Sequence, residues 1–392
     1  MAALSEIPLI GVLFTPGLWF WVGIYAVITL SLNLEAGLTG IPNFGRHLAV
    51  IMGAVAGATV PGYLGLLLLP QSYKAEIASV AGLKLQNVTL GLYASDYNSA
   101  VATELTKYYT SHPGVSFAVF LATVVAAAVL GALVGAAAAY PAARLREDYL
   151  AITLLAAGEA ALIIFYNAGF MGGTQGLTVP NALAWLDRVF GFLGPQAHMA
   201  SSLAIVALLA ALVYAYMELL VRSPAGRLLK GVRENDVAAE ALGKDTARIR
   251  LKTLMMGSAI AAVAGAVFIM WTLGWIATTY NRVSWTFWPW AMMILGGAGN
   301  NLGVLVGAFI LASARQLITF NKDLLARFVP FDPVWLDPII LGVIIILVLM
   351  VRPQGLLPEK TTYPLPRDLL RRLAKKHGAP DEVRPTEKAA LD

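Results

Sequence analysis

Long runs of apolar residues, almost free of charge, constrain this chain more than any other feature of its sequence. They lie near residues 17–34, 48–69, 116–140, 150–168, 200–221, 253–273, 302–319 and 338–351, with a shorter one at 285–298. A helix of about 20 apolar residues crosses a bilayer, and the runs lack the ten-residue alternation of β-barrel strands. The sequence therefore predicts an all-α, polytopic membrane protein with about 8–10 transmembrane helices, in which 285–298 is a re-entrant or broken segment.

The composition supports this class and argues against several kinds of site. The chain is 58% hydrophobic and only 13% charged, whereas soluble domains have about 25% charged residues. It has no Cys, no H-E-x-x-H motif, no G-x-x-x-x-G-K-S/T phosphate loop, and four His without metal-ligand spacing. We therefore expect no metal site, no cofactor bound by this chain and no catalytic role.

The positive charges are concentrated on a few connections between the runs. Residues 222–252 carry eight Lys and Arg, the segment from Arg352 carries nine, and the 141–149 loop carries two, which together make 19 of the 28. By the positive-inside rule these segments are cytoplasmic, and the alternating connections 70–115, 169–199, 274–284 and 320–337 face outward. The N-terminus is then outside and the C-terminus cytoplasmic. This distribution, and not a nucleic-acid partner, accounts for the net charge of +5.

These connections define the expected organisation of the chain. Residues 1–357 are expected to form a transmembrane domain, in which 70–115 is an extracytoplasmic insertion and 222–252 is a cytoplasmic segment. Residues 358–392 are a polar cytoplasmic tail, with nine bases from Arg352 onward and a possible basic surface helix over 368–376.

The 222–252 segment has the pattern of a structured element. Pro224 is suited to open a helix and Gly243 to end one, which predicts a short amphipathic helix or a helix pair between them. Four acidic residues are interleaved with the eight basic ones. A basic cytoplasmic loop commonly contacts anionic lipid headgroups, whereas mixed charge on a compact helical element is typical of a surface that docks a protein.

Six sequence blocks point to one family. "GRLLKGVRENDVAAEALG" (226–243) is close to the pattern G-R-x-L-x-A-I-R-E-N-E-x-A-A-E-A-L-G, and five further blocks accompany it: "LNLEAGLTGIPNFG" (32–45), "YLAITLLAAGE" (149–159), "GGTQGLTVP" (172–180), "ILGGAGNNLGVLVGA" (294–308) and "RPQGLL" (352–357). Together, in this order, they resemble the permease subunits of ABC importers for branched-chain amino acids. The chain departs from the family pattern at Arg46-His47-Leu48, Met171 and Val304.

The resemblance implies a role and a set of partners. Such a subunit pairs with a second homologous permease, rests on cytoplasmic ATP-binding subunits that hold the ATP, and receives solute from an extracytoplasmic solute-binding protein at the cell membrane of a prokaryote. Positions that match the family's motif are the expected ATPase-coupling site: Arg227, Arg233, Glu234, Asn235, Glu240 and Gly243. The implied substrates are branched-chain amino acids, with urea, short amides and other amino acids left open.

Several polar or Gly residues in or near the apolar runs are candidates for the translocation pathway: Asn33, Gly40, Asn43, Glu159, Gly173, Thr174 and Gln175. Each has a structural alternative, because a polar group inside the membrane also serves as an interhelical hydrogen bond, and Gly-rich turns also allow tight helix packing. Two other functional classes remain: an ion-coupled secondary transporter of small solutes, and a membrane enzyme acting on lipid. Glu159 is the only acidic residue clearly inside an apolar run, so the sequence gives little support to an ion-coupled transporter.

Overall fold

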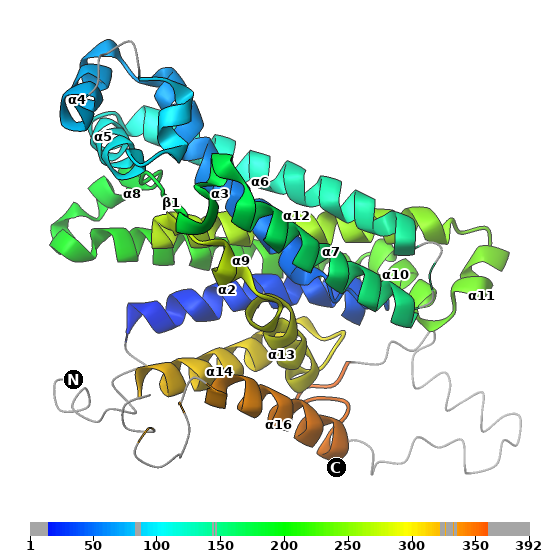
Figure 1. Ribbon diagram of the computed structural model, residues 1–392. Coiled ribbons are helices and arrows are strands. Elements are labelled where there is room, and N and C mark those ends of the chain that lie inside the picture. The colour runs from blue at the N-terminus through cyan, green and yellow to red at the C-terminus, as the bar shows by residue number, and fades with distance from the viewer. Residues whose placement is uncertain are drawn as a thin grey trace, which may run out of the picture. The chain divides into compact units, whose positions relative to one another are not determined.

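The computed structural model of this protein describes residues 15–82, 88–142, 145, 147–321, 326, 332 and 335–359 (Figure 1). The described residues from 15 to 358 form one compact unit. Of the tail expected at 358–392, only Pro358 and Glu359 are described, so the helix expected at 368–376 lies outside the described residues.

The described residues are arranged as helices with one two-residue strand pair. The long helices are α2 (Pro16–Leu32), α3 (Arg46–Leu68), α6 (Pro113–Ala142), α7 (Glu147–Asn167), α9 (Ala197–Arg222), α12 (Thr246–Thr272), α14 (Asn301–Phe320) and α16 (Leu336–Val351). The shorter α-helices are α4 (Gln71–Ala81), α5 (Asn98–Ser111), α8 (Ala184–Val189), α10 (Pro224–Glu234), α11 (Asp236–Ala241) and α13 (Trp288–Gly296). Among the described residues, seven helical segments are long and apolar enough to span a membrane, and α16 is a shorter apolar helix. The predicted all-α membrane fold is confirmed.

Helices α2, α3 and α12 form the buried centre of the bundle, and α6 packs against α3 and α12. Small residues allow this packing. A Cβ atom added at Gly53 of α3 would lie 1.7 Å from the carbonyl oxygen of Ala262 in α12, and one at Gly135 of α6 would lie 2.3 Å from that of Leu254. In a bilayer, helices associate through such close van der Waals contact because lipid tails remove the hydrophobic drive.

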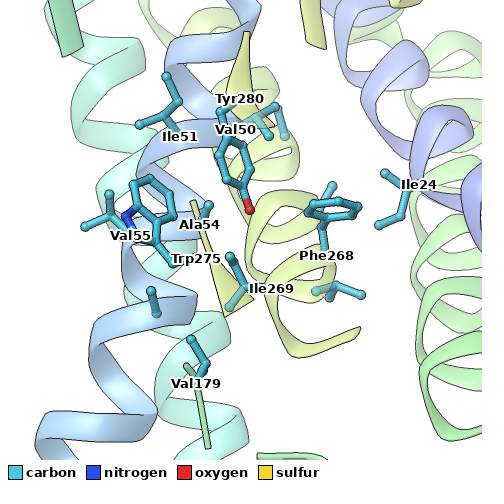
Figure 2. Packing of buried hydrophobic residues seen from close by; sticks show 14 of the residues in the cluster. Ile24, Val50, Ile51, Ala54, Val55, Val179, Phe268, Ile269, Trp275 and Tyr280 are labelled. Atoms are coloured by element: carbon cyan, nitrogen blue, oxygen red, sulfur yellow. The ribbon is translucent and has the colours of Figure 1, made fainter. Parts of the chain in front are cut away.

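Toward one end of the bundle the core becomes aromatic. Val50, Ile51, Ala54 and Val55 of α3 lie opposite Phe268 and Ile269 of α12, with Trp275 and Tyr280 beside them (Figure 2). Trp275 belongs to β2 (Gly274–Trp275), which pairs antiparallel with β1 (Leu177–Thr178). The chain that leaves α12 is therefore folded back against the bundle.

Three of the connections that are poor in Lys and Arg, namely 70–115, 169–199 and 274–284, meet at one end of the bundle. β1 and β2 join 169–199 to 274–284, and Asn98 of α5 is hydrogen-bonded to the backbone of Thr178 in both directions. The 70–115 connection contains α4, the 3-10 turn η5 (Leu90–Ala94) and α5. Helices α10 and α11 lie at the opposite end (Figure 1). The alternation of charge along the chain thus corresponds to two ends of one bundle, and the positive-inside rule remains the basis for assigning the α10–α11 end to the cytoplasm.

The segment expected to be re-entrant or broken contains two elements. The π-helical turn η10 (Val283–Phe287) leads into α13, which ends at Gly296. Nine helical residues rise about 14 Å, less than half of a bilayer core, so α13 does not cross alone. A second π-helical turn, η3 (Asn33–Gly37), follows α2, and both irregular turns lie inside the helix bundle.

The close packing of α3 on α12 predicts the effect of adding one methyl group. Gly53→Ala should lower the stability of the folded protein by about 1–3 kcal/mol, because overpacking displaces a neighbouring backbone. Gly342→Ala in α16 is the matched control, since nothing lies within 4 Å of its added Cβ. Thermal unfolding in detergent should show a lower midpoint for the first variant only. Equal midpoints would contradict the close packing of α3 on α12.

Candidate functional site

The 222–245 segment folds as two short helices because its polar residues cap both. The Ser223 side chain accepts a hydrogen bond from the backbone of Gly226, and Pro224 is the first residue of α10. The Asn235 side chain accepts from the backbone of Ala238, which ends α10 and begins α11. Gly243 has a φ of +75°, which favours Gly, and the Asp245 side chain then caps α12. The sequence left one helix or a pair open, and the structure shows a pair.

The outer surface of this pair combines charge with exposed apolar side chains. Leu229, Val232 and Ala239 face inward and are buried, whereas Val237 is 71% exposed and Leu242 is 79% exposed. Among the expected coupling residues, Arg227, Glu234, Asn235, Glu240 and Gly243 are exposed, and Arg233 is partly buried. We call the exposed residues Arg227, Glu234, Val237, Glu240 and Leu242 the α10–α11 surface.

Two contacts fix α11 to the start of α12. The Thr246 hydroxyl donates a hydrogen bond to the Glu240 carboxylate, and the Arg250 guanidinium donates to Asp236 at 2.9 Å. Because α12 is one of the buried central helices, a displacement of α11 would also move a helix at the centre of the bundle.

The Arg233 side chain points from α10 into the bundle. Its guanidinium donates a hydrogen bond to the carbonyl oxygen of Gly37, the last residue of the π-helical turn η3. Gly40 has a φ of +75°, and a Cβ added there would lie 3.0 Å from Cγ of Arg233. Thus Arg233, an expected coupling residue, meets the turn that contains Gly40, an expected pathway residue.

A chain of side-chain hydrogen bonds runs from this turn to the end of α9. The Asn33 side chain donates to Asn301 at 3.0 Å and accepts the backbone N–H of Gly299 at 2.8 Å. The Asn301 side chain donates to Glu218 at 3.3 Å, and Glu218 pairs with Arg222 at 2.8 Å. Asn33 is therefore an interhelical bridge in this structure.

The break between η3 and α3 is held by an ion pair. Glu35 and Arg46 lie 2.5 Å apart and both side chains are fully buried. Asn43, another expected pathway residue, donates to the Glu35 carboxylate at 2.8 Å. The Arg46 guanidinium also donates to the carbonyl oxygens of Gly257 and Ser31, at 3.0 and 3.1 Å. Arg46 is one of the departures from the family pattern, and here it fills the space between α2, α3 and α12.

Glu159 lies in a different environment near the middle of α7. Its carboxylate is 3.6 Å from the guanidinium of Arg282 and 3.9 Å from Nε2 of His47. The Glu159 side chain is 33% exposed and that of Arg282 is 49% exposed, whereas His47 is fully buried. A charged residue such as Glu159 at the centre of a spanning helix costs about 2.5–3.5 kcal/mol on insertion scales. Packing within this chain leaves Glu159 and Arg282 partly exposed, so it does not offset that cost.

The remaining expected pathway residues lie elsewhere. Gly173, Thr174 and Gln175 form the 3-10 turn η7, directly before β1, and the side chains of Thr174 and Gln175 are exposed. The structure therefore distributes the seven candidates over three places: the turn after α2, the middle of α7 and the β1–β2 end.

Sequence reasoning did not identify the partners of these residues. Asn301, His47 and Arg282 contact candidate residues. Glu218 contacts Asn301 in turn, and none of the four was selected from the sequence. Charge near the end of a predicted span is the available signal for Glu218, and charge directly before a predicted span is the signal for Arg46-His47. A similar signal marks Arg315 of α14, which pairs with Asp337 of α16 at 3.0 Å and donates to the Ser284 hydroxyl.

Comparisons with known proteins agree with this architecture. A family described as "Branched-chain amino acid transport system / permease component" matches residues 15–349. The chain is 38% identical to a probable branched-chain amino acid transport permease protein LivM of Methanocaldococcus jannaschii over 345 residues, 87% of this chain and 92% of that protein. It is 28% identical to the high-affinity branched-chain amino acid transport system permease protein LivM of Escherichia coli over 251 residues, 59% of this chain and 56% of that protein. No solved structure matches the chain.

The buried ion pair predicts a stability difference between single and double variants. Arg46→Met leaves the Glu35 carboxylate buried without its cation and should cost about 3–5 kcal/mol. Adding Glu35→Gln to Arg46→Met removes the uncompensated charge and should recover a large part of that loss. The yield of monodisperse protein and its thermal midpoint in detergent measure both effects. A double variant less stable than Arg46→Met alone would contradict the pairing.

Proposed function

Because this chain belongs to the permease family of branched-chain amino acid transport systems, we propose that it is one of two transmembrane subunits of an ATP-driven ABC importer. The observation that carries this proposal is the hydrogen bond from Arg233 of α10 to the carbonyl oxygen of Gly37. It links a surface suited to docking an ATPase with the break between two central transmembrane helices.

The α10–α11 surface is the proposed docking site for the ATP-binding subunit. The chain contains no phosphate loop, so a partner has to bind and hydrolyse the ATP. Val237 and Leu242 expose apolar side chains at the end of the bundle, between basic and acidic residues. Exposed apolar groups with interspersed charges of both signs suit a protein partner better than a layer of anionic headgroups, which attracts basic residues.

Two routes would transmit motion from this surface. One passes through α11 to the start of α12, by way of the Glu240–Thr246 and Asp236–Arg250 contacts. The other passes through Arg233 to the turn after α2. ATPase closure that moves α10 and α11 would then bias the bundle between outward-facing and inward-facing states, as alternating access requires.

We place the translocation pathway along α7. Only a small share of α7 is buried within this chain, so one face is left for a partner. Glu159 lies at the edge between this exposed face and the residues packed on the bundle. A second homologous permease would cover this face and complete the pathway between the two subunits. The β1–β2 end, with Gly173, Thr174 and Gln175, would face the solute-binding protein, and the turn with Asn33, Gly40 and Asn43 would act as the inner gate.

The proposed cargo is a branched-chain amino acid. The decisive experiment is reconstitution in proteoliposomes with the ATPase, the second permease and the solute-binding protein, followed by measurement of leucine uptake. We expect uptake that requires ATP and persists without an ion gradient. Leucine uptake driven by an ion gradient alone would overturn the proposal in favour of a secondary transporter.

Charge reversal on the α10–α11 surface tests the docking site. Glu234→Lys combined with Glu240→Lys should leave membrane insertion intact but reduce ATPase co-purification about tenfold or more, the factor that about 1.4 kcal/mol of lost binding produces. ATP-dependent uptake should fall with it.

Glu76→Lys combined with Asp96→Lys is the matched control, because both residues are exposed acids in the 70–115 connection at the opposite end of the bundle. This control should retain the ATPase. Full ATPase retention and normal uptake in the Glu234/Glu240 double variant would exclude α10 and α11 as the docking element.

A further inference from the structure

We propose that Glu159, Arg282 and His47 form a binding site for the two charged ends of a zwitterionic amino acid. This inference rests on the transport function proposed above and assigns the residues that contact the cargo within the bundle. The three residues come from α7, from the segment before η10 and from the first turn of α3, and they converge at distances of 3.6 and 3.9 Å.

The Glu159–Arg282 pair differs from the other ion pairs between distant helices. Glu35 and Arg46 are fully buried, 2.5 Å apart and joined by further hydrogen bonds. Glu159 and Arg282 meet only at 3.6 Å, both are partly exposed, and no side-chain hydrogen bond is formed by either within the described residues. The pair therefore has hydrogen-bonding capacity that the fold does not use.

His47 supplies the second, independent observation. Its backbone N–H donates to the Thr286 hydroxyl oxygen at 3.0 Å, and its Nδ1 lies 3.0 Å from the same oxygen. Nε2 faces the Glu159 carboxylate, which is an acceptor. The neutral tautomer that suits both neighbours therefore has the Thr286 hydroxyl donating to Nδ1 and the imidazole proton on Nε2. Nε2 is buried without a hydrogen-bond partner among the described residues and faces Glu159.

The neighbouring backbone makes room for this imidazole. A Cβ atom added at Gly158 would lie 2.2 Å from both Cε1 and Nε2 of His47. The absence of a side chain at Gly158 is thus what permits a polar ring to sit against α7 beside Glu159. A buried polar atom left unpaired destabilises a protein. A ligand that forms a hydrogen bond with Nε2 would remove this penalty and gain binding free energy.

The chemistry of the three groups matches an α-amino acid. The Arg282 guanidinium and the His47 Nε2–H are donors for a carboxylate, and the Glu159 carboxylate accepts from an ammonium. A zwitterion that enters between Glu159 and Arg282 replaces one long ion contact by charge-assisted hydrogen bonds at each end. The net charge of the site does not change, which keeps the bound state compatible with a low-dielectric surrounding.

The flanks of the site fit a branched aliphatic side chain. One helical turn from Glu159, α7 carries Leu155 on one side and Leu162 and Ile163 on the other. Urea and short neutral amides lack both formal charges, so they would not engage Glu159 and Arg282 in the same way. The site therefore favours amino acids among the substrates that the sequence leaves open.

Transport by the complete reconstituted importer tests this assignment. Glu159→Gln and Arg282→Gln should each retain ATPase co-purification but lower ATP-dependent leucine uptake about tenfold or more. The double variant Glu159→Gln/Arg282→Gln has no unpaired charge, so a purely structural ion pair would predict recovery. A binding site predicts that the double variant stays as defective as the single ones.

The Arg315–Asp337 pair provides the control, because it joins α14 to α16 at 3.0 Å and is paired with neither Glu159, Arg282 nor His47. Arg315→Gln with Asp337→Asn should lower thermal stability while the KM for leucine uptake stays unchanged. The His47→Ala variant should raise that KM, and His47→Gln, which restores a donor, should recover part of the loss.

The outcomes separate this inference from the proposed function. If the unmodified importer shows ATP-dependent leucine uptake and the Gln variants transport normally, the site is overturned while the importer function stands. Recovery of uptake in the double Gln variant also overturns the site, because it identifies a structural pair. If the unmodified importer shows no ATP-dependent uptake of leucine, the proposed function itself fails.

Discussion

The fully buried ion pair between Glu35 and Arg46 holds the break on which the rest of this structure depends. A helix that ends inside a bilayer leaves backbone groups without partners, and no water is present to pair them. Arg46 satisfies the carbonyl oxygens of Ser31 and Gly257 and neutralises the Glu35 carboxylate, to which Asn43 donates a hydrogen bond. The turn between α2 and α3 therefore keeps an irregular shape at the centre of the bundle, and Arg233 reaches the carbonyl oxygen of Gly37 because of it.

The sequence alone predicts the long apolar helices, the broken segment at 285–298 and the bounds of the helical segment between Pro224 and Gly243. Hydropathy sets the spans, since a spanning helix has to be apolar over its whole length. Pro224 and Gly243 bound the α10–α11 pair as expected, because one fits the first helical turn and the other a positive φ. The split at Asn235 is also local, since its side chain caps α11. Each of these features depends on residues within a few positions of each other.

The contacts within the candidate site could not be predicted in the same way. Asn33 bonds to Asn301, which is 268 residues away, and Arg282 meets Glu159 from a different helix. Hydrophobic periodicity carries no information about which helices are neighbours in a bundle that is apolar on all sides. Charge inside or directly before a span does mark Arg46, His47 and Glu159 as unusual. It does not indicate which ion pair is fully buried and hydrogen-bonded and which is partly exposed.

The two neighbouring residues Arg46 and His47 connect the coupling helix α10 with the proposed amino-acid site. Arg46 and His47 are consecutive residues in the first turn of α3: Arg46 closes the turn after α2, and His47 faces Glu159. Arg233 contacts the same turn from the coupling helix α10. Motion of α10 would therefore reach the proposed amino-acid site through this turn and the first turn of α3. No long series of flexible side chains is needed. Such a route needs two discrete arrangements of the turn. The π-helical turn η3 is a place where the backbone hydrogen bonds can change from one arrangement to the other.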